Sequence, residues 1–238
     1  MSDESRLPGT PARIGNGRAG SRPRTEAWLS FRADHARARD AVHSEMSEQF
    51  IEAMTSERHC AVLQTLCTSR EDFILNPPHG KRASNSEMEK LSVLSNAKQS
   101  DIQIVISDGL SASAVAANVP DLLPMLEDGL RMEKISFGVP VIVRYGRVAI
   151  GDQIAYATGA RIVVNLIGER PGLSCATSLS AYITYNPGPH TISSDRTVVS
   201  NIHKGGTPPL EAGAYIVQLC KKILRLEISG VRLQQRTE

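Results

Sequence analysis

The chain has 238 residues, of which 41% are hydrophobic and 22% are charged, and its formal net charge is +2. This balance is typical of a globular protein and excludes fibrous and disulfide-scaffold classes. Such a small net charge does not indicate nucleic-acid binding, although eight Arg and five acidic residues lie within residues 1–43. A segment of mixed sign is more typical of a solvated helix face or a subunit-docking segment.

The cysteines and histidines show neither a disulfide nor a metal-binding pattern. None of the four cysteines forms a Cys-x-x-Cys pair, and the six histidines lack the spacing of zinc ligands. No apolar run approaches the roughly 20 residues that span a bilayer, and the N-terminus has no signal-peptide pattern. We therefore expect a soluble, cytosolic protein with reduced thiols.

The first hundred residues divide into an arm and a helical region. Residues 8–24 are rich in Gly, Pro and Arg and cannot bury apolar surface, so residues 1–24 are predicted to be an extended arm. Helical periodicity then recurs, and residues 25–98 are predicted to be a helical region. The expected helices cover residues 25–46, 59–68 and 84–97.

Residues 99–238 alternate between strand and helix patterns. Runs rich in Val and Ile are followed by polar loops and then by helical periodicity, which is typical of parallel strands buried on both faces. The predicted class is α/β, with a helical N-terminal arm followed by a mostly parallel open sheet and flanking helices. The expected strands cover residues 101–106, 139–144, 161–167, 181–185 and 197–200. The expected helices cover residues 112–132, with an interruption at Pro120 to Pro124, 152–158 and 209–229.

A charged pair, Glu169-Arg170, stands where the third of these strands should end in a turn. A chain that only had to turn needs no such pair before Pro171, so we expect something polar beyond the strand. Ligands of open α/β sheets bind beyond the carboxyl ends of the strands. The alternative is that the pair only shapes the turn. The loops expected to meet at that edge cover residues 107–111, 144–148, 168–173 and 200–206.

Catalytic and nucleotide-binding motifs are not found in the context that they require. No Gly-x-Gly-x-x-Gly follows the first strand, and no Walker-type loop is present. A hydrolase triad could be drawn from Ser107, Asp108, Ser111 and His203, but no Gly-x-Ser-x-Gly elbow supports it. Asp108 is also explained as a carboxylate that caps a turn or helix, and His203 as an ordered loop residue. The residues alone predict an α/β ligand-binding module of unassigned chemistry. The alternatives are a stand-alone module without catalysis and a nucleic-acid-binding arm.

Several stretches, in order, resemble one known family. They are GNGRAGSRPRT, ADHARARD, VISDGLSA, VRYGRVAIGDQI, LIGERPGL, DRTVVSNIHKGGTPP and EAGAYIVQL. Together they resemble the light (small) subunit of ethanolamine ammonia-lyase from Arg13 to Gly230. The resemblance implies a Rossmann-like, cobalamin-contacting domain over residues 99–238, and a region 25–98 that docks on the heavy subunit.

This resemblance implies an adenosylcobalamin-dependent lyase that converts ethanolamine to acetaldehyde and ammonia by radical chemistry. In this family the heavy subunit carries the substrate site and most of the catalytic groups, and the light subunit closes over the cobalamin. The expected assembly is a trimer of dimers of heterodimers, and this chain is expected to be inactive alone. The cofactor carries the difficult step, and the protein supplies binding and orientation.

The resemblance places the family's light-chain cobalamin contacts on Val148 of YGRV and Glu169 of GERPGL. A third contact, usually a cysteine, falls on Val198, so a hydrogen bond from a thiol is lost while apolar contact can persist. Arg147 is expected to reach an amide or phosphate of the cofactor. Glu169 can accept a hydrogen bond from an amide on the corrin rim, whereas Arg170 cannot and is expected to pair with a carboxylate or to meet the heavy subunit.

Two absences bear on the cofactor and on the location. No Asp-x-His-x-x-Gly motif is present, so the resemblance implies a base-on cofactor that keeps its own dimethylbenzimidazole, with no ligand to cobalt from this chain. Twelve residues precede Arg13, fewer than in family members whose longer N-terminus is associated with a bacterial microcompartment. The bacterial cytoplasm is therefore the expected location, ahead of a microcompartment.

Overall fold

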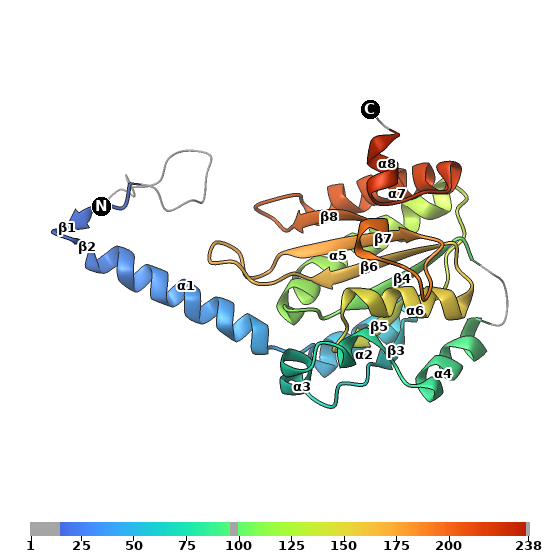
Figure 1. Ribbon diagram of the computed structural model, residues 1–238, viewed down its shortest axis with the longest axis horizontal. Coiled ribbons are helices and arrows are strands. Elements are labelled where there is room, and N and C mark those ends of the chain that lie inside the picture. Colours follow the sequence, from blue (N-terminus) through green and yellow to red (C-terminus); the bar gives the residue numbers. More distant parts are fainter. Residues whose placement is uncertain (1–14, 96–99, 237–238) are drawn as a thin grey trace.

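The computed structural model describes residues 15–95 and 100–236. Its six longer strands are β3 (Ala61–Gln64), β4 (Ile102–Ser107), β5 (Val141–Arg144), β6 (Ile162–Gly168), β7 (Leu179–Tyr185) and β8 (Arg196–Ile202). They form one sheet in the order β3-β5-β4-β6-β7-β8 (Figure 1). The first four strands of this order are parallel, and β7 is antiparallel to both of its neighbours. The predicted α/β class with a mostly parallel sheet is confirmed.

Helices cover both faces of the sheet (Figure 1). Along β4, side chains alternate between two buried clusters: Ile104 belongs to the cluster formed with α5 (Ala112–Met132) and α7 (Pro209–Leu226), and Val105 to the cluster formed with α6 (Val148–Thr158). This alternation follows from the period of two along a strand. Burial on both faces explains why the parallel strands are nearly continuous runs of Val and Ile.

Helix α5 runs without a break through Pro120 and Pro124, so the predicted interruption is wrong. A proline inside a helix removes a hydrogen bond and costs about 3 kcal/mol. The helix compensates with an apolar side buried against the sheet and α7, whereas Pro120 is on its exposed side. The fully buried residues of this side are Val115, Val119, Leu122, Leu123, Leu126 and Leu130.

The predicted helix over residues 59–68 is also wrong. Helix α2 (Glu48–Arg58) ends just before this segment, and His59 adopts a left-handed conformation that stops it. Strand β3 follows and forms one edge of the sheet. Its Leu63 is buried and its Val62 is exposed, which is the alternation of a strand rather than of a helix. The region predicted to be helical therefore contributes a strand to the sheet.

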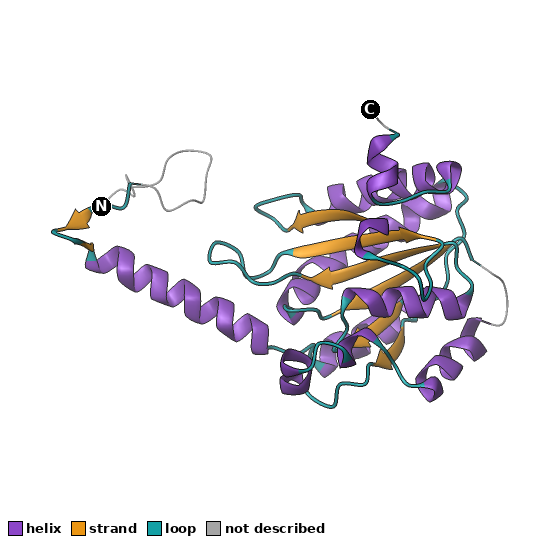
Figure 2. Cartoon of the chain, in the orientation of Figure 1, coloured by secondary structure: helices purple, strands orange, loops and turns teal. Residues whose placement is uncertain are grey.

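The N-terminal part projects away from the sheet (Figure 2). A short antiparallel hairpin of β1 (Arg18–Ala19) and β2 (Arg22–Pro23) leads into α1 (Thr25–His43), in which only Ala41 is buried. Residues 1–14 of the predicted extended arm lie outside the described residues. Among the described residues, none of the helices is both long and apolar enough to cross a membrane. The remaining elements are α3 (Arg70–Leu75), α4 (Asn85–Ser95), α8 (Val231–Gln235) and the 3-10 turns η1 (His79–Lys81) and η2 (Ser193–Asp195).

Candidate functional site

Four polar loops meet at the carboxyl edge of the sheet, as predicted. Strands β4, β5, β6 and β8 end at this edge, and β7 begins there. The loops after β4 and β6 touch through the backbone, since Leu110 N donates to Gly168 O at 3.0 Å. A Cβ atom on Gly168 would lie 2.1 Å from Ser111 O, and Gly109 has a φ of +56°. The close approach of the two loops therefore requires glycine at both positions.

The carboxylate of Asp108 organises the turn that follows β5. Its Oδ2 accepts a hydrogen bond from Tyr145 N at 2.9 Å, and its Oδ1 accepts one from Gly146 N at 2.7 Å. Tyr145 has a φ of 58°, which is uncommon for a residue other than glycine. The two bonds hold this turn immediately before α6. Asp108 is thus a turn-stabilising carboxylate, which is the simpler of the two roles considered for it.

Arg70 is a buried partner of Asp108 that no sequence pattern singles out. Its Nη1 lies 3.6 Å from Asp108 Oδ2 and donates to Gly109 O at 2.8 Å, while its Nε donates to Val42 O at 2.7 Å. Burial raises the pKa of Asp108 to about 6, against the opposing effects of Arg70 and of the backbone amides. Burial also lowers the pKa of Arg70. Both charges carry a desolvation cost, and the pair joins the last turn of α1 to the sheet edge.

Arg147 directly precedes α6, but its guanidinium lies against Phe73. Its Nη2 donates to Phe73 O at 2.8 Å, and its Cζ lies 4.2 Å from the centroid of the Phe73 ring. The guanidinium of Arg70 lies over the same ring at 4.7 Å, so two cations stack on one aromatic side chain. The backbone N of Arg147 donates to Gly80 O at 2.7 Å. Arg147 therefore holds the segment around α3 and η1 against the start of α6.

The carboxylate of Glu169 ties three strands together. It accepts hydrogen bonds from Ser178 Oγ at 2.8 Å, from Ser180 Oγ, and from Asn201 N at 3.2 Å. The last of these reaches β8 across β7, near an irregularity in the pairing of the two strands. A carboxylate has about four acceptor positions, so three internal bonds leave about one position for a ligand. Arg170, in contrast, is exposed.

Val148, Glu169 and Val198 lie on the same side of the sheet. A cross-strand row of Asn165, Tyr182 and Val198 runs across β6, β7 and β8, and partners in such a row point to one side. Glu169 follows Asn165 by four residues and has the same parity. Asn165 Nδ2 donates to Val148 O at 3.1 Å, which brings the start of α6 to this side. We call this surface, formed by these five residues, the α6 face.

The hydrolase alternative finds no assembled triad. Ser107 Oγ donates to Asn165 Oδ1 at 3.0 Å, and Ser111 caps the N-terminus of α5. Both ring nitrogens of His203 are engaged within its loop: Nε2 lies 2.8 Å from Asn201 Oδ1, and Nδ1 accepts from a backbone amide at 3.1 Å. Among the described residues, His203 bonds to no serine and is an ordered loop residue.

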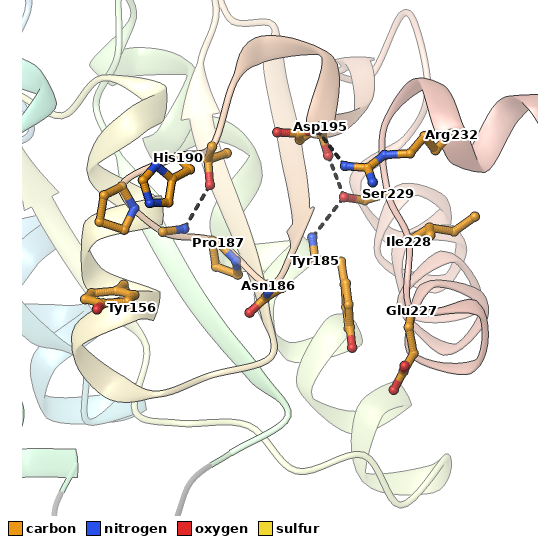
Figure 3. A pocket seen from close by; sticks show the side chains of 13 residues that line it. Tyr156, Tyr185, Asn186, Pro187, His190, Asp195, Glu227, Ile228, Ser229 and Arg232 are labelled. Carbon is orange, nitrogen blue, oxygen red and sulfur yellow. Dashed lines mark hydrogen bonds and ion pairs between the residues drawn. The ribbon is translucent and has the colours of Figure 1, made fainter.

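A pocket of about 440 Å³ lies at the opposite edge of the sheet (Figure 3). Tyr156 and His190 line one side of it, and Asp195, Ser229 and Arg232 line the other, where Arg232 pairs with Asp195 at 3.2 Å. None of the predicted cofactor contacts lines this pocket. In the described part of the chain, no group of three or more His, Cys, Asp or Glu side chains could hold a metal ion.

The sequence matches one protein family over most of its length. Residues 6–234 match the family described as ethanolamine ammonia-lyase light chain (EutC). The chain belongs to the ethanolamine ammonia-lyase light chain family. This confirms the resemblance inferred from the seven sequence stretches.

Relatives named ethanolamine ammonia-lyase small subunit match this chain over most of their own length. Ethanolamine ammonia-lyase small subunits of Clostridium tetani, Clostridium perfringens and Listeria monocytogenes serotype 4a are 49%, 44% and 44% identical to this chain over 225 residues. These matches cover 94% of this chain and 74%, 75% and 75% of the three relatives. The names of these relatives describe a subunit of a lyase.

The burial of Asp108 predicts a pH-dependent stability of this light-chain family member. The pKa of this acid is raised from 3.8 to about 6 on folding, so the folded state binds more protons than the unfolded state in this range. The free energy of unfolding should therefore fall as the pH rises between these two pKa values. Relative to Asp108→Asn, the wild type should lose up to about 3 kcal/mol between about pH 4 and pH 7.

Urea unfolding of both proteins at several pH values in this range measures the difference. Comparison with the variant cancels the contributions of the other titrating groups to the free energy of unfolding. A wild-type stability that rises with pH relative to the variant would show that Arg70 and the backbone amides outweigh burial.

Proposed function

We propose that this chain is the light subunit of an adenosylcobalamin-dependent ethanolamine ammonia-lyase of the bacterial cytosol. The enzyme converts ethanolamine to acetaldehyde and ammonia. The heavy subunit carries the substrate site, and this chain closes over the cofactor without a catalytic residue of its own. The expected assembly is a trimer of dimers of heterodimers. Membership of the light-chain family supports the identity.

The cofactor role rests on one observation, the position of Val148, Glu169 and Val198 on the α6 face. These residues come from the start of α6, the end of β6 and the more distant strand β8, yet they lie on one surface. Val198 is 45% exposed and offers apolar contact, while Glu169 offers an acceptor position. A corrin ring has an apolar body with amide groups around its rim, so the residues present fit this group.

Bound adenosylcobalamin supplies the radical chemistry of the reaction. This chain binds the cofactor, orients it and keeps water from one side of it. Three internal hydrogen bonds already fix the Glu169 carboxylate, so little conformational freedom is lost when it accepts a bond from the cofactor. Val198 makes an apolar contact where the family has a thiol. Arg147 contributes by holding the start of α6, and therefore Val148, in place.

The lower ligand of cobalt is proposed to be the cofactor's own dimethylbenzimidazole. His203 stands in the loop after β8, at the same edge as the α6 face. Both of its ring nitrogens are engaged within that loop. His203 is therefore not proposed as a ligand to cobalt, and the cofactor is proposed to be base-on.

Helix α1 is the proposed docking element for the heavy subunit. Trp28 and Leu29 are 49% and 57% exposed, and the rings of Trp28 and Phe31 stack with their centroids 5.8 Å apart. Only Ala41 is buried in this helix. An isolated helix of this length is marginal in water, so a partner that covers its aromatic side explains its stability. The heavy subunit is the partner that the family membership supports.

Reconstitution with a heavy subunit tests the proposed function. The chain alone, the heavy subunit alone and the two co-expressed are each assayed for acetaldehyde release from ethanolamine, with and without adenosylcobalamin. We expect the two chains to copurify, and we expect activity only in the co-expressed sample with cofactor. Failure of the chains to copurify would instead favour a stand-alone ligand-binding module. Copurification without cofactor-dependent activity would contradict the proposed reaction.

Trp28→Ala should weaken association with the heavy subunit. A buried tryptophan is a frequent hot spot of interfaces, so the dissociation constant of the two chains should rise by about tenfold or more. Sedimentation of the two chains over a range of concentrations measures it. Tyr156→Ala is the matched control, because Tyr156 is also an exposed aromatic residue on a helix but lies at the opposite edge of the sheet. Equal association of wild type and Trp28→Ala would exclude this docking role.

Glu169→Gln should weaken cobalamin binding more than ethanolamine binding. The variant loses a charged acceptor, and a hydrogen bond to a charged group corresponds to about a tenfold change in the dissociation constant. Absorbance titration of the complex with cobalamin measures this constant, and the KM for ethanolamine is compared in the same variants. Ser178→Ala is the control, because it removes one internal bond to the same carboxylate and leaves the acceptor in place. An equal loss of affinity in both variants would assign Glu169 a purely structural role.

A further inference from the structure

Tyr182 occupies the centre of the α6 face and takes no part in the contacts assigned above. It pairs with Asn165 of β6 on one side and with Val198 of β8 on the other. Asn165 in turn donates to Val148 O at 3.1 Å. Tyr182 therefore lies between the start of α6 and Val198, on the surface where the cofactor contacts are proposed.

On its side of the sheet, Tyr182 lies between buried and exposed neighbours, since Asn165, Ser180 and Thr184 are buried and Val198 of β8 is exposed. Helix α6 packs on the apolar side chains of β4, β5 and β6, including Val105, Val143 and Val163. Helices α5 and α7 cover the other side (Figure 1). Tyr182 is half-buried, and Val198 is exposed. An aromatic ring and a valine thus form an apolar strip along β7 and β8 next to α6.

The hydroxyl of Tyr182 is free to bind a ligand. It forms no hydrogen bond within the described part of the chain. It is also not one of the buried polar atoms without a partner, so the hydroxyl oxygen is accessible from outside. Tyrosine is commonly found where one end of the side chain is apolar and the other end meets a polar group. A tyrosine hydroxyl can donate a hydrogen bond, which the carboxylate of Glu169 cannot do.

The two side chains complement each other toward an amide-bearing ligand. Glu169 has about one acceptor position left after its three internal bonds, and this position suits the N–H of an amide. The carbonyl oxygen of an amide needs a donor. On the α6 face, Tyr182 supplies an unused donor beside the apolar contacts of Val148 and Val198.

We propose that Tyr182 is a further cobalamin-binding residue of this chain. Its ring packs against the corrin rim between Val148 and Val198, and its hydroxyl donates to the carbonyl oxygen of a rim amide. This inference rests on the proposed function, because it takes the same cofactor as the ligand of the α6 face.

Equilibrium binding of cyanocobalamin to the complex of both subunits tests the inference without turnover. Absorbance titrations compare the wild type with Tyr182→Phe, which removes only the hydroxyl, and Tyr182→Ala, which removes the ring as well. We expect dissociation constants raised about fivefold for Tyr182→Phe and at least about thirtyfold for Tyr182→Ala. Tyr215→Phe and Tyr215→Ala are matched controls, because Tyr215 is an exposed tyrosine on α7, across the sheet. They should bind as the wild type does.

The outcomes separate this inference from the proposed function. Wild-type affinity in both Tyr182 variants would overturn the inference and leave the proposed function standing. Wild-type affinity in Tyr182→Phe alone would overturn the hydrogen bond. A wild-type complex that binds no cobalamin would overturn both. Since Tyr182→Phe keeps the ring and its packing, the comparison remains decisive even if Tyr182→Ala disturbs the fold.

Discussion

The buried carboxylate of Asp108 is the point on which the carboxyl edge of the sheet depends. Two backbone amides of the turn after β5 donate to it, and Arg70 pairs with it. A buried ion pair is a weak source of stability, because desolvation offsets most of the attraction. The Asp108 carboxylate matters here for geometry. It holds Tyr145 in a left-handed conformation and so fixes where α6, with Val148, begins. Through Val42 the ion pair also connects this edge to the end of α1.

The change of strand direction at β7 extends the sheet by the two strands on which part of the proposed cofactor surface lies. The parallel strands β5, β4 and β6 are buried on both sides. Strands β7 and β8 extend the sheet past the apolar side chains on which α6 packs, and Asp152 of α6 pairs with Arg196 of β8. Glu169 closes this extension by joining the end of β6 to Ser178, Ser180 and Asn201. The Glu169 carboxylate, which a simple turn would not need, therefore both joins these strands and is the acceptor on the proposed cofactor surface.

Local sequence patterns predict the elements that are long or fully buried. They fail where tertiary contacts determine the secondary structure. The Val and Ile runs of β4, β5 and β6 are unmistakable because both of their faces are buried. Strand β3 has four residues with Val62 exposed, too short a signal to separate from a helix, and the prolines of α5 are tolerated only because of its packing. Only the family resemblance predicts Val148 and Glu169 as cofactor contacts. The role of Arg70 follows only from its tertiary contacts, and that of Tyr182 only from the sheet register, since their partners are distant in sequence.

Helix α1 has a consequence for how the protein is made. Only one of the nineteen residues of α1 is buried, so few tertiary contacts keep this helix folded. It therefore unfolds locally more readily than the sheet domain and becomes accessible to proteases. Its stacked aromatic residues would also be available to other exposed apolar surfaces, including those of further copies. With the proposed docking of the heavy subunit on α1, chains synthesised in excess of that subunit are the ones exposed to cleavage and aggregation. Production of the two chains in matched amounts, close together in time, would protect this arm.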